Sequence, residues 1–151
     1  MIAFKELQDI VKRTTGWERK LLDLYDVAEF GIKNKDSKAV IKFLKERQED
    51  NLEILENIDV KKYGKTEWVR FASDYKDEEL IPKRNIKKDS TPVEIFNCIL
   101  EYENKLKDFY HSIFERLSTE AQKELFDSLV KFKDEQISRI KNLMERHYPA
   151  R

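Results

Sequence analysis

Apolar residues recur every three to four positions along four long stretches of the chain, which is the spacing of amphipathic helices. These stretches cover about residues 4–33, 38–58, 92–117 and 118–147. Only short polar links separate the first stretch from the second and the third from the fourth. The pattern therefore predicts an all-α fold, a four-helix bundle built from two helical hairpins.

Two of the predicted helices have clear start signals. Thr91-Pro92-Val93-Glu94 combines a capping box with proline at the first helical position. Asn34-Lys35-Asp36-Ser37 is typical of a turn, and we expect Asp36 or Ser37 to cap the second helix.

Residues 59–90 form a connection that is longer than the usual link between neighbouring helices, so we expect it to cross the length of the domain. Within it, the spacing of four residues predicts a short amphipathic helix: Trp68, Phe71, Ala72 and Tyr75. The basic run at positions 83–88 is most simply a solvated loop.

The composition limits the possible partners. The 151 residues predict one domain, 1–151, and its 30 acidic residues balance its 30 basic ones. This balance argues against a nucleic-acid or anionic-membrane binder, since neither would gain long-range attraction. No apolar run is long enough for a membrane span, and the single Cys98 is suited to a reducing cytoplasm.

The two hairpins are related by an internal repeat. Glu18 and Tyr25 recur as Glu103 and Tyr110 after a shift of 85 positions, and the register continues without a gap through the second helix of each hairpin. The repeat halves are about 4–58 and 91–145. Both glutamates fall on apolar helical faces, where an unpaired carboxylate is costly. A pseudo-two-fold bundle is therefore expected, with the two glutamates facing one interior point.

These features resemble the ferritin-like superfamily and, within it, the rubrerythrin-like branch. The resemblance implies a ferritin-like bundle in which the first and third helices each supply a glutamate, here Glu18 and Glu103. It also implies a Glu-x-x-His from each of the other two helices, the six side chains holding two iron or manganese ions.

The second half of that ligand pattern is missing from this chain. The positions equivalent to the family's Glu-x-x-His are occupied by Gln48 and Asn51 in the second helix and by Lys133 and Gln136 in the fourth. Shifting the register by one or two residues restores no histidine. Amides are weak neutral donors and an ammonium repels a dication, so we predict no metal ligand and no cofactor.

Our hypothesis is that Lys133 takes the place of the metals, hydrogen-bonded between Glu18 and Glu103, with the amides completing a polar network. Tyr25 and Tyr110 are expected to be core residues that bond a buried carboxylate. Cys98 is expected to be buried, and the two histidines, His111 and His147, to lie at the surface or at a helix end.

The interpretation that follows is a non-catalytic structural, binding or regulatory protein, for which we also expect a homodimer formed through an exposed helix pair. Two alternatives remain open. One is an iron- or manganese-dependent oxidoreductase or peroxide-handling protein, with an atypical site drawing on nearby acids such as Glu49, Asp134 or Glu135. The other is a small-molecule pocket in the centre of the bundle.

Overall fold

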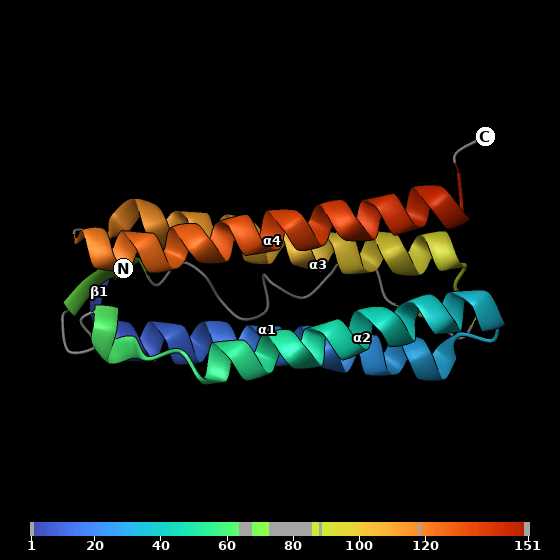
Figure 1. Cartoon of the computed structure of the whole chain (residues 1–151), viewed down its shortest axis with the longest axis horizontal. Coiled ribbons are helices and arrows are strands. Elements are labelled where there is room, and N and C mark those ends of the chain that lie inside the picture. Colours follow the sequence, from blue (N-terminus) through green and yellow to red (C-terminus); the bar gives the residue numbers. More distant parts are fainter. Residues whose placement is uncertain (1, 64–67, 73–85, 88, 118, 150–151) are drawn as a thin grey trace.

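Four long helices form the body of the molecule in the computed structural model, which describes residues 2–63, 68–72, 86–87, 89–117 and 119–149. Their bounds are α1 Leu7–Gly31, α2 Lys35–Glu56, α3 Pro92–Arg116 and α4 Glu120–His147. α1 packs along α2 and α3 along α4, and the two hairpins stack on each other (Figure 1). The predicted all-α four-helix bundle is confirmed.

The four helices do not simply alternate in direction. α1 and α4 run one way along the bundle, whereas α2 and α3 run the other way (Figure 1). α3 accordingly begins at the end of the bundle opposite to the end where α2 stops. The first helices of the two hairpins, α1 and α3, also contact each other. This contact brings the middles of the two repeat halves together.

The helix starts follow the capping chemistry of the sequence, with one correction. The side chain of Thr91 accepts a hydrogen bond from the backbone N–H of Glu94, as predicted. α2 is capped by Asn34 instead of Asp36 or Ser37, because the Asn34 Oδ1 accepts from the backbone N–H groups of both those residues. The helix therefore begins earlier than predicted.

Two expectations about the chain outside the bundle were wrong. The segment around Phe4 is a strand, β1 Ile2–Glu6, so the first helix begins only at Leu7. The segment expected to form a short helix is instead strand β2 Trp68–Ala72, which pairs with β1 in antiparallel register, Ile2 opposite Ala72. Aromatic and β-branched residues favour strands, and the partner strand supplies backbone hydrogen bonds that one isolated turn of helix lacks.

The connection also contains a 3-10 turn, η1 Val60–Tyr63, which contacts α4, while β2 contacts α3. Tyr75 and most of the basic run at positions 83–88 lie outside the described residues. Among the helices that the structure describes, none has an apolar stretch of the length needed to cross a membrane.

The core runs along the whole bundle as one apolar cluster to which all four helices contribute. Cys98 is buried within α3, as predicted. His111 is exposed and lies 2.9 Å from Glu115, and His147 is the last residue of α4. Both histidines lie where the sequence predicted them.

Candidate functional site

Each helix carries a fully buried polar side chain near the middle of its apolar stripe. On α1 the stripe is interrupted by Glu18, on α2 by Gln48, on α3 by Glu103 and on α4 by Lys133, and each of these side chains is at most 1% exposed. Apolar core residues adjoin these positions at spacings of three or four, such as Leu21 after Glu18, Leu44 before Gln48, Leu106 after Glu103 and Ile137 after Lys133. The four polar side chains therefore meet at the centre of the bundle, with no water-facing route for their charges.

Lys133 lies between the two carboxylates. Its Nζ is 2.7 Å from Oε2 and 2.5 Å from Oε1 of Glu18, and it is 3.0 Å from Oε2 of Glu103. All three side chains have no exposed surface. The predicted contact of the ammonium with both glutamates is present.

The repeat explains how this contact is built. In the first hairpin, Gln48 donates to the Glu18 carboxylate thirty positions before it, at 2.7 Å. In the second hairpin, Lys133 makes the equivalent bond to Glu103, also thirty positions before it. The lysine side chain is longer than that of glutamine, so its Nζ also reaches Glu18 across the bundle. The presence of lysine at position 133, where the first half of the repeat has Gln48, thus links the two hairpins.

Glu18 is the better satisfied of the two carboxylates. It accepts from Lys133, from the Gln48 Nε2 and, at its Oε1, from the Tyr110 hydroxyl at 2.7 Å. The same Gln48 Nε2 also donates to the backbone carbonyl of Glu18 at 2.9 Å. Charge-assisted hydrogen bonds of this kind are the strong ones in proteins. The Glu18 carboxylate is therefore held by donors from the other three helices.

Glu103 has only one of these partners. Its Oε2 accepts from Lys133, whereas its Oε1 is buried and has no hydrogen-bond partner among the described residues. The pKa of Glu103 is raised to about 7, chiefly because burial disfavours the carboxylate; the Lys133 ammonium opposes this increase and the Glu18 carboxylate adds to it. Glu103 is thus a buried carboxyl that gains and loses its proton near neutral pH.

The lysine keeps its charge in this environment. Burial alone lowers the pKa of an ammonium, but the Glu103 and Glu18 carboxylates outweigh it and raise the pKa of Lys133 above its usual value. When Glu103 is protonated, the cluster contains one ammonium and one carboxylate. When Glu103 is ionised, the cluster carries an excess negative charge in a low-dielectric core.

The two repeated tyrosines differ. Tyr110 bonds Glu18, as predicted, but Tyr25 makes no hydrogen bond to either carboxylate, so that prediction was wrong for Tyr25. Both tyrosines are buried, and burial together with the nearby glutamates raises the pKa of each well above its usual value. Both phenols therefore stay protonated, and only one of them stabilises the cluster directly.

The remaining amides do not complete the network, contrary to our expectation. The Nδ2 of Asn51 and the Oε1 atoms of Gln48 and Gln136 are buried without a hydrogen-bond partner among the described residues. A buried polar group without a partner costs roughly 1–3 kcal/mol. The polar centre is therefore well bonded around Glu18 and poorly bonded on the side of Glu103 and the amides.

A dinuclear metal centre does not fit these residues. The Lys133 ammonium lies where two dications would have to be, and no cluster of three or more histidine, cysteine or acidic side chains occurs within the described part of the chain. The acids of the alternative site, Glu49, Asp134 and Glu135, are exposed. Asp134 is paired with Lys107 at 2.6 Å. The structure does not bring these acids together with Glu18 and Glu103.

One contact beside the cluster was not predicted. The Tyr102 hydroxyl donates to the backbone carbonyl of Trp17 at 2.8 Å and so joins α3 to α1 next to the two glutamates. Trp17 and Tyr102 are 85 positions apart and are repeat mates. The contact could have been predicted from the repeat. Equivalent residues of the two halves lie close together where they are near the pseudo-two-fold axis, as Trp17 and Tyr102 are.

The chain has no significant match among the family models, the curated proteins or the solved structures with which it was compared.

Proposed function

We propose that the protein is a non-catalytic four-helix bundle of ferritin-like type, with a structural, binding or regulatory role, in which an internal ion cluster replaces a dinuclear metal centre. The observation that carries the proposal is the position of the Lys133 ammonium within 3.0 Å of both Glu18 and Glu103. A fixed cation between the two carboxylates supplies the charge that iron or manganese would otherwise supply. It offers no open coordination position and no change of oxidation state.

The ferritin-like part of the proposal is supported by three features together. The chain is an internal repeat with a glutamate at the middle of each first helix. α1 runs parallel to α4, and α2 runs parallel to α3 (Figure 1). These directions are the ones expected when the connection between two hairpins crosses the length of the bundle. The residues at the family's ligand positions Glu18, Gln48, Glu103 and Lys133 converge in the core.

The cluster would act as a structural device that fixes how the two hairpins align. It draws on all four helices, and a slip of one helix by one turn would separate its buried charges from their partners. Breaking a buried ion pair by removing one partner typically costs about 3–5 kcal/mol, whereas the net gain from forming the pair is small. The cluster therefore contributes more to selecting one arrangement of the helices than to the net free energy of unfolding.

We further propose a homodimer and a reducing, cytoplasmic setting. Among the described residues, the exposed large hydrophobic side chains outside the groove between α2 and α4 are Val27 and Phe30 on α1, Ile54 on α2 and Val93 on α3. Phe30 is 93% exposed near the end of α1. Exposed apolar side chains on the outer surface of α1 and α2 favour contact with a second copy. The single cysteine, Cys98, is buried and has no second cysteine with which to form an internal disulfide, which agrees with a reducing compartment.

Metal content tests the central proposal. The purified protein, loaded anaerobically with Fe(II) or Mn(II) and then desalted, is expected to retain no stoichiometric metal. A matched variant that reinstates the family's ligands, Gln48→Glu, Asn51→His, Lys133→Glu and Gln136→His, is expected to retain metal. Stoichiometric binding by the unaltered chain that is lost in Glu18→Ala or Glu103→Ala would favour the metal-dependent oxidoreductase instead.

A further inference from the structure

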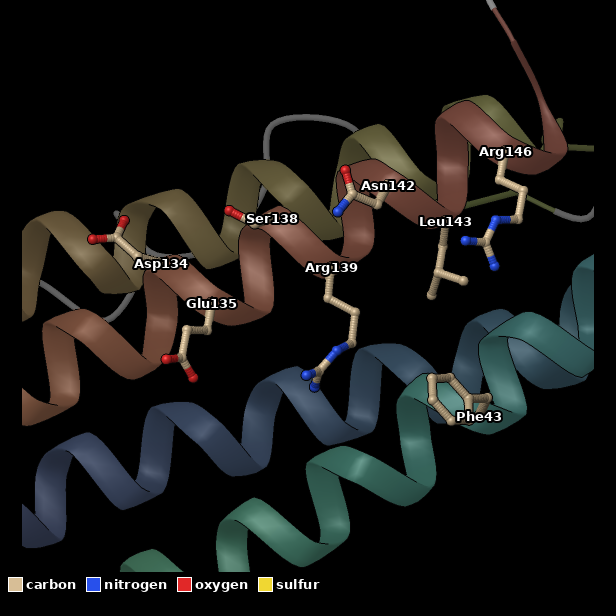
Figure 2. Close-up of a pocket in the computed structure, with 8 residues that line it drawn as sticks. All are labelled: Phe43, Asp134, Glu135, Ser138, Arg139, Asn142, Leu143 and Arg146. Atoms are coloured by element: carbon tan, nitrogen blue, oxygen red, sulfur yellow. The ribbon is translucent and has the colours of Figure 1, made fainter.

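A groove of about 590 Å³ lies between α2 and α4 on the surface of the bundle, away from the buried cluster. Phe43 of α2 forms one side, and residues of α4 form the other. Figure 2 shows Glu135, Arg139, Leu143 and Arg146 extending from α4 toward the α1–α2 hairpin, on which Phe43 is labelled. Their spacing of three to four places them along one face of the helix. A volume of this size is within the range of small-molecule sites.

Positive charge without a partner is the first distinguishing feature of this groove. Neither Arg139 nor Arg146 is within ion-pair distance of an acid among the described residues, in contrast to Arg19, whose guanidinium contacts Glu56. Arg47 of α2 is likewise without an acidic partner. It lines a small adjoining pocket together with Arg139, and its Cζ lies 5.7 Å from the centre of the Phe43 ring. Two arginines, Arg139 and Arg146, thus line the groove two helical turns apart, and Arg47 lies beside Arg139.

The acidic residues of the groove do not cancel this charge. Asp134 is already paired with Lys107 at 2.6 Å. Glu135 precedes Arg139 by four residues and lies on the same face of α4, but the two side chains form no ion pair among the described residues. Arg146 lies eleven residues beyond Glu135, which corresponds to roughly 16 Å along a helix. The end of the groove near Arg146 is therefore the end that attracts an anion most strongly.

The apolar residues define the rest of the ligand. Phe43 is 45% exposed, and it lines the groove with Leu143 between the two arginines of α4. Guanidinium groups bind carboxylate and phosphate in a bidentate manner and stack on flat rings. An aromatic or aliphatic body could pack on Phe43 and Leu143 while its anionic group is bound by the arginines.

We propose that this groove is a binding site for a small organic anion, an apolar or aromatic body bearing a carboxylate or phosphate group. Arg139 and Arg146 bind the anionic group, assisted by Arg47, and Phe43 packs against the apolar body. The site lies outside the ion cluster, so the proposal does not depend on the loss of the metal centre. Evidence against the ion cluster would leave the groove proposal intact, and evidence against the groove would leave the ion-cluster proposal intact.

Calorimetric titration of the full chain with phenyl phosphate, inorganic phosphate and phenol separates the contributions of charge and ring. Phenyl phosphate is expected to bind with a defined stoichiometry of one per chain, and the other two probes about tenfold more weakly or worse, since each lacks one half of the recognition. Arg139→Gln is expected to weaken phenyl phosphate binding about tenfold or more, and Phe43→Ala to weaken phenyl phosphate but not inorganic phosphate. Arg116→Gln, at the end of α3, is the matched control and should change nothing.

A second measurement locates the probe and guards against misfolded variants. In NMR spectra, phenyl phosphate should shift the side-chain N–H signals of Arg47, Arg139 and Arg146 and leave those of other arginines unchanged. Arg139→Lys keeps the charge without the bidentate geometry and should bind with intermediate affinity. Absence of binding at millimolar phenyl phosphate, equal losses in Arg139→Gln and Arg116→Gln, or occupation of the groove by a second copy of the chain would overturn the proposal.

Discussion

Glu18 and Glu103 occupy equivalent positions in the two halves of the repeat, yet their carboxylates are bonded differently. Lys133, Gln48 and Tyr110 all donate to Glu18, whereas Lys133 alone donates to Glu103. The second oxygen of Glu103 has no partner among the described residues. The pseudo-symmetry of the backbone is therefore broken by the chemistry at its centre, and the two glutamates should respond differently to pH and to substitution.

The first prediction is that the protein loses stability as the pH rises toward neutrality. Glu103 has an ordinary pKa of 4.5 and a pKa of about 7 in the folded chain, so between these values the folded state holds a proton that the unfolded state has lost. The free energy of unfolding should then fall from about pH 4.5 to about pH 7, by at most about 3 kcal/mol for a fully buried group. Urea unfolding at a series of pH values measures this slope.

Glu103→Gln isolates the group responsible. The neutral amide still offers an oxygen to Lys133, so the variant should match the parent protein near pH 5 and exceed it in stability above pH 7. Glu18→Gln is the contrasting control: it removes a carboxylate that accepts from three side chains and should cost at least about 2 kcal/mol even at pH 5. If the slope is the same in Glu103→Gln as in the parent, Glu103 does not titrate near neutrality.

The second prediction concerns Lys133. Lys133→Met fills a similar volume but leaves both carboxylates without their cation, so the variant should lose about 3–5 kcal/mol of unfolding free energy near pH 8. At pH 5 the loss should be smaller, because the two carboxyl groups can take up protons and remove the uncompensated charge. Denaturant unfolding at the two pH values tests this difference. An equal loss at both values would contradict a Glu–Lys–Glu cluster.

Much of this arrangement could be predicted from the sequence, because it rests on local rules. The apolar stripes located the four helices, and the capping box at Thr91 located a helix start. The resemblance to the ferritin-like ligand pattern, applied to both halves of the repeat, placed Lys133 between the glutamates. The helices and their starts were predicted from spacing within the chain, whereas the position of Lys133 also needed the family pattern.

The errors came from relationships that local spacing does not contain. β1 forms because Ile2–Glu6 meets Trp68–Ala72, and neither segment reveals its partner by itself. The repeat also made Tyr25 and Tyr110 look equivalent. In the folded chain only Tyr110 bonds a glutamate, because side-chain packing need not follow the backbone pseudo-symmetry. The orphaned amide atoms of Asn51 and Gln136 could not be predicted for the same reason.

The third prediction uses this pair of tyrosines. Tyr110→Phe removes the hydrogen bond to the Glu18 carboxylate and should lower the free energy of unfolding by about 1.5–3 kcal/mol, the range for a bond to a charged group. Tyr25→Phe removes a hydroxyl that bonds neither glutamate and should cost less than about 1 kcal/mol. Thermal and urea unfolding of the two variants side by side provide the comparison. Equal costs would mean that Tyr25 also supports the cluster.

The fourth prediction addresses the proposed homodimer. Phe30 is 93% exposed on α1, so Phe30→Asp should leave the fold intact while introducing a charge where two copies would bury apolar surface. We expect the parent chain to sediment as a dimer and the variant as a monomer in analytical ultracentrifugation. Val93→Asp places the same charge on α3, where the exposed valine lies outside the proposed α1–α2 interface, and should remain dimeric. A monomeric parent chain, or dissociation by Val93→Asp and not by Phe30→Asp, would show that the apolar face of α1 and α2 does not join two copies.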